Sequence, residues 1–156
     1  MSVKIGIGID VHAFEAGKVL VLGGIEINGY PGLKGHSDGD VVVHSIIDAL
    51  LGAANLGDIG EWFGEKDPKY ESIDSKELLR EVVNKIVALG FKISQVDVAV
   101  LCEVPKVSEH RTDIVRTIEE IVGAGTISIK GSSPEGLGSL GRNEGVMSYA
   151  VALLEV

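Results

Sequence analysis

Three of the chain's four histidines lie in two short segments, and these segments constrain the fold more than any other feature. The first is Asp10-Val11-His12, which follows the alternating apolar run of residues 3–9, and the second is residues 35–44, which contains His36 and His44. Residues two apart in a strand share a face, so Asp10 and His12 can reach one ion together. A third ligand has to come from elsewhere. His44 is the best placed, one turn into a predicted helix whose start would lie beside the end of the strand.

Two imidazoles and one carboxylate form a ligand set that suits zinc. Three protein ligands leave a fourth tetrahedral position for substrate or water, which is the arrangement of a catalytic ion. The alternative is that Asp10 caps a turn, while His12 and His44 are ordinary core or surface histidines.

Composition limits the classes to which the chain can belong. At 156 residues we expect a single domain over residues 1–156. A net charge of −9 argues against nucleic-acid binding, although a bound cation still permits a phosphate substrate. The only cysteine, Cys102, excludes an internal disulfide, and we find neither a leader nor an apolar run of the roughly 20 residues that a membrane helix needs. We therefore expect a soluble, cytoplasmic protein without nucleic-acid or membrane partners.

The spacing of apolar residues predicts strands and helices that mix without strict βαβ order. Gly23-Gly24 predicts a hairpin turn between two short strands. A helix is predicted from Ser37 or Asp38 to about Asn55. The other predicted elements are, in chain order, a loop over 58–74, a helix capped by Ser75 and running to Gly90, a strand over 93–104, a helix from 108 to about 122, a strand over 126–130, a glycine-rich turn region over 131–145, and a strand over 146–156 that is buried on both faces.

Asp40, His44 and Asp48 are four residues apart on the first predicted helix and so share one face. A carboxylate there can hold the second N–H of a ligating histidine and fix its tautomer, which makes Asp40 or Asp48 a candidate for that role. A solvated acidic stripe is the alternative. His36, just before the helix, can donate to an oxyanion or be an ordinary loop histidine.

Ser133 and Pro134 suit the first positions of a helix or turn, where backbone N–H groups are free to bind anions. With Lys130 before this segment and Arg142 after it, a diphosphate could bind here, and Glu135 could hold Mg²⁺ against its oxygens. A plain glycine-rich turn is the alternative.

Cys102 lies near the end of a predicted apolar strand, and we interpret it as a small core residue without a redox role. Pro105-Lys106 directly after it could shape a small-molecule pocket or merely end the strand.

Five segments together resemble one enzyme family, the 2-C-methyl-D-erythritol 2,4-cyclodiphosphate synthases. The resemblance runs essentially from end to end and leaves no room for a fused second enzyme. The segments are Gly8-Ile9-Asp10-Val11-His12-Ala13-Phe14, Gly35-His36-Ser37-Asp38-Gly39-Asp40, the run from His44 through Asp48-Ala49-Leu50-Leu51-Gly52-Ala53-Ala54, Leu56-Gly57-Asp58-Ile59-Gly60, and Gly141-Arg142-Asn143-Glu144-Gly145.

The resemblance implies a homotrimer of single-domain α+β subunits. In each, a mixed β-sheet packs against helices and faces the threefold axis, and active sites lie at subunit boundaries. It implies Zn²⁺ on Asp10, His12 and His44, with Glu135 helping to hold Mg²⁺ or Mn²⁺ between substrate phosphates. His36 and Ser133 match positions that stabilise the transition state.

The resemblance also implies the substrate contacts. Residues near the methylerythritol or ribose are Ser37, Asp58, Ile59, Gly60, Phe63, Gly64, Glu65, Lys66 and Asp67. Those enclosing the cytosine end are Cys102, Glu103, Val104, Pro105, Lys106, Val107, Ser108 and Ser132. Arg142 would bind phosphate, and Asp10, Val11, His12, His36, Ser133, Pro134, Glu135 and Ser139 complete the expected substrate-binding set.

In the implied reaction, the 2-phosphate of 4-diphosphocytidyl-2-C-methyl-D-erythritol 2-phosphate attacks the β-phosphorus and releases CMP. A zinc-dependent phosphohydrolase of a nucleotide diphosphate is a second hypothesis, and product identity separates the two. A non-catalytic assembly protein, in which the metal only stabilises the fold, is a third.

The sequence departs from the family pattern at four positions. Glu65 replaces a common aspartate, and Ser133 replaces a threonine but keeps the hydroxyl. Ile9 and Ser139 stand where many relatives have phenylalanines lining a pocket on the threefold axis. The resemblance therefore leaves the binding of an isoprenoid diphosphate there open.

Overall fold

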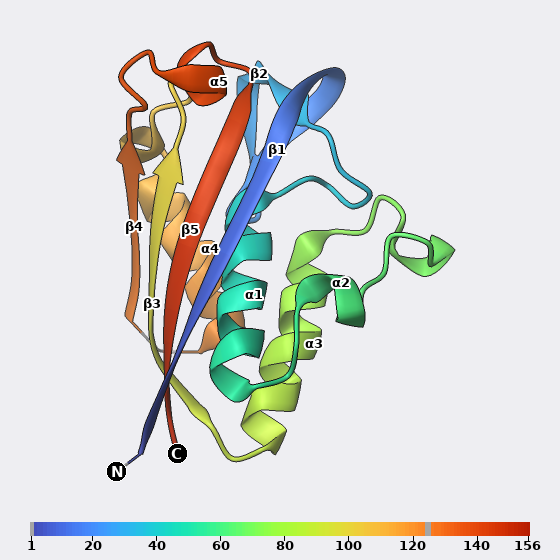
Figure 1. Ribbon diagram of the computed structural model, residues 1–156, viewed down its shortest axis with the longest axis vertical. Helices are drawn as coiled ribbons and strands as arrows, with labels where there is room; N and C mark the ends of the chain where they lie inside the picture. Colours follow the sequence, from blue (N-terminus) through green and yellow to red (C-terminus); the bar gives the residue numbers. More distant parts are fainter. Residues whose placement is uncertain (1, 124–125) are drawn as a thin grey trace.

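The computed structural model describes residues 2–123 and 126–156. Its core is one mixed five-stranded sheet with strand order β2-β1-β5-β3-β4, and the longer helices cover one face of it (Figure 1). The neighbouring strands pair antiparallel, except β3 and β4, which are parallel. The strands are β1 (Val3–Leu22), β2 (Ile25–Leu33), β3 (Lys92–Leu101), β4 (Thr126–Ser132) and β5 (Gly145–Glu155). This is the single-domain α+β architecture that the sequence predicts.

The helices are α1 (Val41–Ala54), α2 (Ile59–Trp62), α3 (Ser75–Ala88), α4 (Arg111–Val122) and α5 (Gly138–Gly141), with short 3₁₀ turns at Pro68–Tyr70 (η1) and Val107–Glu109 (η2). The predicted loop over 58–74 therefore contains two short helical elements. The glycine-rich region over 131–145 contains a third. In the described part of the chain, none of the helices is both long and apolar enough to cross a membrane.

Two glycines of β1 allow helix α1 to lie directly on the sheet. A Cβ at Gly6 would overlap the carbonyl oxygen of Ala49, and one at Gly8 would overlap that of Ser45. Both carbonyls belong to α1, so any side chain at either glycine would push the helix away. The alternation of isoleucine and glycine in residues 5–8 thus places apolar side chains on one face of the strand and the helix backbone against the other.

The start of α1 is fixed by Asp40, whose side chain is fully buried. Its carboxylate accepts hydrogen bonds from the helix N–H groups of Val42 and Val43, both at 3.1 Å, as an N-cap does. It also accepts from the N–H groups of Gly23 (2.9 Å) and Gly24 (2.7 Å) in the predicted hairpin turn. Burial and the neighbouring Asp38 raise the pKa of Asp40 to about 6, against the opposing effect of these N–H donors.

Several predicted helix and strand ends are displaced. Helix α1 begins at Val41 rather than at Ser37 or Asp38, since the fully buried Asp40 is the cap. Asp74, not Ser75, caps α3, because its side chain accepts from the N–H of Lys76 at 2.9 Å. The third long helix begins at Arg111 rather than 108, and the preceding strand ends at Leu101 rather than Val104.

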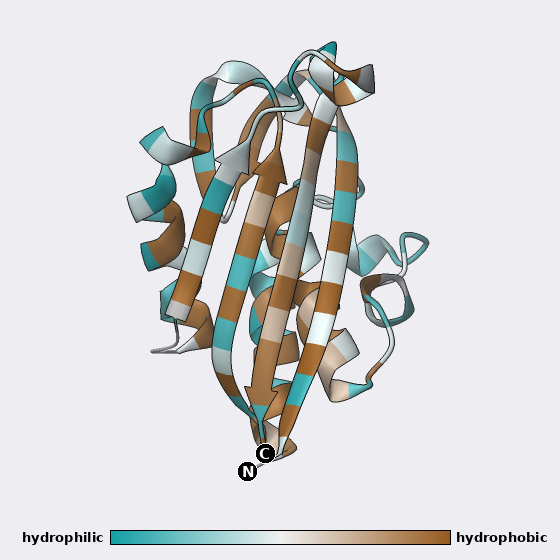
Figure 2. Cartoon of the chain, turned by 60° about the vertical axis from the view of Figure 1, so that its left-hand side comes forward, coloured by the Kyte–Doolittle hydropathy of each residue, from teal (hydrophilic) through white to brown (hydrophobic). Residues whose placement is uncertain are grey.

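The prediction that the last strand is buried on both faces is wrong for the single chain. Residues of β5 alternate between buried and exposed, with Tyr149 38% and Val151 44% exposed. The same face of the sheet carries Ile5 and Ile7 of β1, at 68% and 61%. Figure 2 turns this uncovered face toward the viewer, and its colouring shows hydrophobic residues recurring along the strands.

We predict that Asp40→Ala destabilises the protein by about 2–4 kcal/mol, because it removes an N-cap and leaves the two turn N–H groups without their acceptor. Asp74→Ala is the matched control, since Asp74 caps α3 through a single N–H, and we expect it to cost about 1 kcal/mol. Urea unfolding of the two variants measures the difference. Equal losses would contradict the role of Asp40 in joining helix to hairpin.

Candidate active site

Asp10, His12 and His44 meet where β1 passes the first turn of α1. One carboxylate oxygen of Asp10 lies 2.9 Å from Nε2 of His12 and 3.0 Å from Nδ1 of His44. Ligand atoms of the three residues all lie within 4.8 Å of one another. Asp10 and His12 are two residues apart in β1 and therefore lie on the same face of the strand. The close approach of α1 at Gly6 and Gly8 brings the third residue, His44, within reach of them.

The electrostatics of this triad favour a cation. Burial pushes the pKa of Asp10 upward, but the hydrogen bonds with His12 and His44 outweigh it and lower the pKa to about 2. The hydrogen bond to Asp10 raises the pKa of His12, against the effect of burial. The triad is therefore an anionic oxygen between two imidazole nitrogens, each of which offers a lone pair when a metal displaces its proton.

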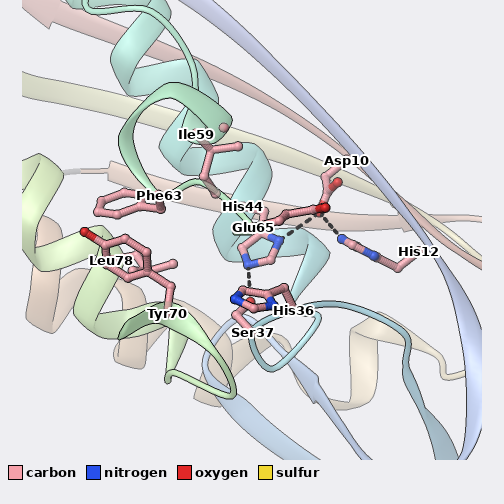
Figure 3. A pocket seen from close by; sticks show the side chains of 11 residues that line it. Asp10, His12, His36, Ser37, His44, Ile59, Phe63, Glu65, Tyr70 and Leu78 are labelled. Atoms are coloured by element: carbon pink, nitrogen blue, oxygen red, sulfur yellow. Dashed lines mark hydrogen bonds and ion pairs between the residues drawn. The ribbon is translucent and has the colours of Figure 1, made fainter. Parts of the chain in front are cut away.

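The residues fit a divalent metal ion. One carboxylate and two imidazoles are donors that zinc and similar ions take, and three protein ligands leave a coordination position on the open side. That side faces a pocket (Figure 3). The side chain of His44 is only 11% exposed, while those of Asp10 and His12 are each 23% exposed, so an ion held by them would be largely shielded by the protein and open to the pocket.

The second ring nitrogen of His44 faces two hydroxyl groups. Its Nε2 lies 2.8 Å from Oγ of Ser75 and 3.0 Å from Oγ of Ser37. The prediction that Asp40 or Asp48 holds this nitrogen is therefore wrong. Asp40 caps the helix as described, and Asp48 accepts from the N–H of Ile59 at 2.8 Å, where it positions the start of α2.

Most residues that the sequence assigned to the metal and methylerythritol end line this first pocket. They are Asp10, His12, His36, Ser37, His44, Ile59, Gly60, Phe63 and Glu65. Figure 3 shows the triad on one side and an apolar wall of Phe63, Tyr70 and Leu78 opposite. The rings of Phe63 and Tyr70 pack edge to face with centroids 5.2 Å apart.

The remaining residues assigned to that end do not line the first pocket. Asp58 accepts from the N–H of Glu61 at 2.9 Å and caps α2. Asp67 caps η1, and its carbonyl oxygen lies 3.4 Å from Nε2 of His36. Gly64 and Lys66 lie in the segment between these caps. Val11 lines a more open hollow that also includes Lys34 and shares His12, His36 and Glu65 with the first pocket.

A second pocket lies where β3 and β4 end. Its lining residues are Cys102, Glu103, Pro105, Lys106, Val107, Ser108, Arg111, Gly131, Ser132 and Ser133. Burial raises the pKa of Cys102 to about 11, and its Sγ lies 3.4 Å from the carbonyl oxygen of Pro105, so the thiol is neutral. Val104 is part of the same segment but not of the lining.

The glycine-rich segment folds over the edge of this second pocket. Oγ of Ser133 accepts from the N–H of Glu135 at 3.0 Å, and Glu103 accepts from the N–H of Gly136 at 2.8 Å. Glu135 has a φ of 55°, which presents its side chain from a tight turn. The segment is thus an ordered turn rather than the start of a long helix, and Pro134 lies between the hydrogen-bonded Ser133 and Glu135.

The two basic residues on either side of this segment, Lys130 and Arg142, form ion pairs with acidic side chains. Lys130 forms an ion pair with Asp97, with Nζ 2.5 Å and 2.6 Å from its two oxygens, and it does not line the second pocket. Arg142 lies 3.1 Å from Glu144 on the surface, following Ser139 in α5.

Four residues that line the two pockets were not assigned to the site from the sequence, namely Tyr70, Leu78, Arg111 and Gly131. Tyr70 is one of the aromatic residues of the segment predicted as a loop, and its contact with Phe63 depends on the fold of α2 and η1. Leu78 has ordinary helical core spacing. Arg111 received no role from the sequence, and its Nε donates to the carbonyl oxygen of Ile129 at 3.0 Å.

Comparisons with known proteins agree with this geometry. The model of the YgbB family matches residues 3–155. The curated 2-C-methyl-D-erythritol 2,4-cyclodiphosphate synthases of Desulfatibacillum aliphaticivorans and Clostridium acetobutylicum are 46% and 45% identical, over 97% of this chain and 99% of each relative.

Solved structures share the fold over almost the whole chain. A complex of the Plasmodium falciparum protein IspF with CDP has a TM-score of 0.87 and 34% identity, and the alignment covers 98% of this chain and 96% of that one. The bifunctional IspDF of Campylobacter jejuni has a TM-score of 0.94 and 37% identity over 98% of this chain. This chain spans 42% of that longer protein.

We predict that the affinity of the triad for a divalent metal falls as the pH is lowered through the pKa of His12, which lies above 6.5 in the metal-free protein. Protons then compete for the ligand nitrogen, and the loss should be roughly tenfold per pH unit for each proton displaced. Titration with Co²⁺, followed by its visible absorption between about pH 6 and pH 8, measures this. An affinity independent of pH would contradict the assignment of His12.

In the pH range where His12 titrates, the stability of the metal-free protein should fall as the pH rises, whereas the affinity for metal increases. Because the folded pKa of His12 is raised, its contribution is present below 6.5 and is lost as the pH rises through the raised value. Because the folded pKa of Asp10 is lowered, its contribution is present above 3.8 and is lost as the pH falls toward 2. Thermal unfolding with and without metal checks the sign, since the stabilisation by metal should grow with pH.

Proposed function

The chain belongs to the YgbB family, and from that premise we propose that it is a 2-C-methyl-D-erythritol 2,4-cyclodiphosphate synthase. It converts 4-diphosphocytidyl-2-C-methyl-D-erythritol 2-phosphate to the 2,4-cyclodiphosphate and CMP. It is thus a phosphorus–oxygen lyase of non-mevalonate isoprenoid precursor synthesis. The observation that carries the proposal is the convergence of Asp10, His12 and His44 on the wall of an open pocket in a chain related to the synthases over nearly its full length. The phosphohydrolase hypothesis draws no support from these relatives.

We propose that Zn²⁺ is the ion held by Asp10, His12 and His44, and that Glu135 helps to hold Mg²⁺ or Mn²⁺. Zinc suits the two imidazoles, and the harder ions suit carboxylate and phosphate oxygens. When bound, the two ions neutralise and align the two phosphate groups that react.

The chemistry needs positioning more than it needs protein bases. A 2-phosphate oxygen, already ionised near neutral pH, forms a bond to the β-phosphorus. The bond from that phosphorus to the bridging oxygen breaks, and CMP leaves with this oxygen and its electron pair. Well-oriented intramolecular reactions reach effective molarities of about 10⁵ M or more, so holding the substrate folded supplies much of the rate.

The chain's own donors would stabilise the charge that develops on the phosphorus oxygens. His36, in the first pocket, and Ser133, in the second, have polar groups that can donate to them. Ser133 already orders the turn that carries Glu135, so its hydroxyl and that carboxylate come from one rigid piece. Arg142 would bind phosphate from the surface beside α5.

The two pockets suit the two ends of the substrate. Ser37, Ile59, Gly60, Phe63 and Glu65 line the metal pocket and would enclose the methylerythritol end. Cys102, Lys106, Ser108 and Ser132 line the second pocket and would enclose the cytosine. A solved relative in complex with CDP supports a cytidine diphosphate as the ligand class.

We propose further that the active enzyme is a homotrimer in which the second pocket of one subunit faces the metal pocket of its neighbour. The two pockets lie at opposite parts of the sheet in one chain, one at β1 and the other at the ends of β3 and β4. The uncovered sheet face, with Ile5, Ile7 and Val151 exposed, is the apolar surface that such an assembly would bury around its axis.

Residues 1–156 would act as one synthase domain in the cytoplasm. The family match over residues 3–155 and the single sheet support one domain. The small, phosphorylated substrate is of a kind made and used inside cells.

We predict that His44→Ala lowers turnover roughly 10³-fold or more, because charge stabilisation by the ion is worth several kcal/mol. His110→Ala is the control, since His110 lies at the start of α4 away from the triad. Phosphorus NMR identifies the products. The wild-type protein should give a cyclic diphosphate and CMP in a zinc-dependent reaction, and the appearance of linear phosphates alone would mean that the proposed reaction is wrong.

A second prediction tests the shared site. His44→Ala damages the metal pocket and Ser133→Ala the second pocket, so each variant alone should be nearly inactive. When equal amounts of the two variants are unfolded together and refolded at random, the whole preparation should regain about a quarter of wild-type activity, because about one boundary in four joins two intact pockets. Absence of any gain in mixed trimers, verified by mass spectrometry, would show that each site lies within one subunit.

A further inference from the structure

We propose that Asp38 and Ser75 are positioning residues that set the tautomer of His44 and thereby present its Nδ1 to the metal. Neither residue belongs to the ligand set or to the substrate contacts assigned above. They come from two different elements, the loop before α1 and the first turn of α3. The inference rests on the metal site proposed above and concerns how the chain prepares its third ligand.

The chain of hydrogen bonds starts at Asp38. Its carboxylate accepts from the backbone N–H of Ser75 at 2.9 Å and from that of Asp40 at 3.1 Å. It also accepts the hydroxyl proton of Ser75, with Oγ at 2.5 Å. Two backbone donors therefore hold the carboxylate in place, and it acts as an acceptor for the serine.

This arrangement determines which hydrogen bond the Ser75 hydroxyl donates and which it accepts. A serine hydroxyl has one proton, and that proton is given to Asp38. The side that Ser75 turns toward Nε2 of His44, 2.8 Å away, is therefore a lone pair. Nε2 must carry the hydrogen and donate it. A metal takes the neutral imidazole, in which only one nitrogen is protonated, so with the hydrogen on Nε2 it is the lone pair of Nδ1 that is presented to a metal beside Asp10.

Burial strengthens the hydrogen bond between Ser75 and His44. Ser75 is fully buried and His44 nearly so, which keeps competing water away from the bond. Ser37 also lies near Nε2, at 3.0 Å, and is 3.4 Å from Oγ of Ser75. Ser37 faces the substrate pocket, whereas Ser75 is the hydroxyl anchored by a carboxylate. Ser75 is thus the acceptor whose orientation the protein sets.

The test compares Ser75→Ala with Ser45→Ala. Ser45 is the matched control, because it is a fully buried serine next to His44 whose hydroxyl is bonded to Ser148 at 2.8 Å. Both changes remove one buried hydroxyl. Alanine is also a good helix former at the first position of α3, where Asp38 still receives the backbone N–H.

The first readout is zinc affinity, measured by competition with a chromophoric chelator. We expect Ser75→Ala to weaken zinc binding roughly 10- to 100-fold, as loss of a partner behind a metal ligand commonly does, and Ser45→Ala to change it less than about twofold. Asp38→Asn is the second variant. It should also weaken binding, because an amide cannot accept from all three donors that Asp38 serves.

The second readout is the ring N–H signal of His44 in ¹⁵N-histidine-labelled, zinc-loaded protein. We expect a slowly exchanging Nε2–H proton in the wild type and in Ser45→Ala, and faster exchange with an upfield shift in Ser75→Ala. Zinc affinity and an Nε2–H signal both unchanged in Ser75→Ala would overturn the positioning role. If the wild-type protein itself bound no zinc, the metal site and this inference would both be wrong.

Discussion

The contact between α1 and β1 determines where everything else in the site can lie. It is possible only because Gly6 and Gly8 have no side chains where the carbonyl oxygens of Ala49 and Ser45 approach the strand. At that distance His44 reaches the carboxylate that Asp10 shares with His12. A wider spacing between helix and sheet, as ordinary side chains would require, would separate the third ligand from the other two.

Two carboxylates, one fully buried (Asp40) and one half-buried (Asp38), then fix the surrounding segments to that contact. Asp40 joins the first turn of α1 to the hairpin at Gly23-Gly24, and Asp38 joins the preceding loop to α3. Each serves several backbone N–H groups at once, which is a use of negative charge that needs no cationic partner. The acidic composition of the chain is in this respect structural, and it leaves the metal ions to supply positive charge to a phosphate substrate.

The sequence was most informative where the geometry is local. The period of a strand places Asp10 and His12 on one side, and glycine pairs mark the hairpin, so these features could be predicted without a structure. The cap of α1 could not, because Ser37, Asp38 and Asp40 are all acceptable caps. The choice among them depends on the hairpin N–H groups that only the folded chain brings near.

The partners of His44 show the same limit. Spacing along a helix places Asp40 and Asp48 on the face of His44, but it does not determine which way each side chain points. The true neighbour, Ser75, is 31 residues away in the chain and was read as a helix cap. The residues Tyr70, Leu78 and Arg111 were missed for a related reason, since their positions at the pockets follow from the packing of separate elements.

The neutral thiol of Cys102 has a consequence for the chemical durability of the second pocket. Peroxide and alkylating reagents attack the thiolate, and a pKa of about 11 leaves almost none of it at neutral pH. A pocket wall that contains the chain's only sulfhydryl group is therefore protected from oxidants by desolvation.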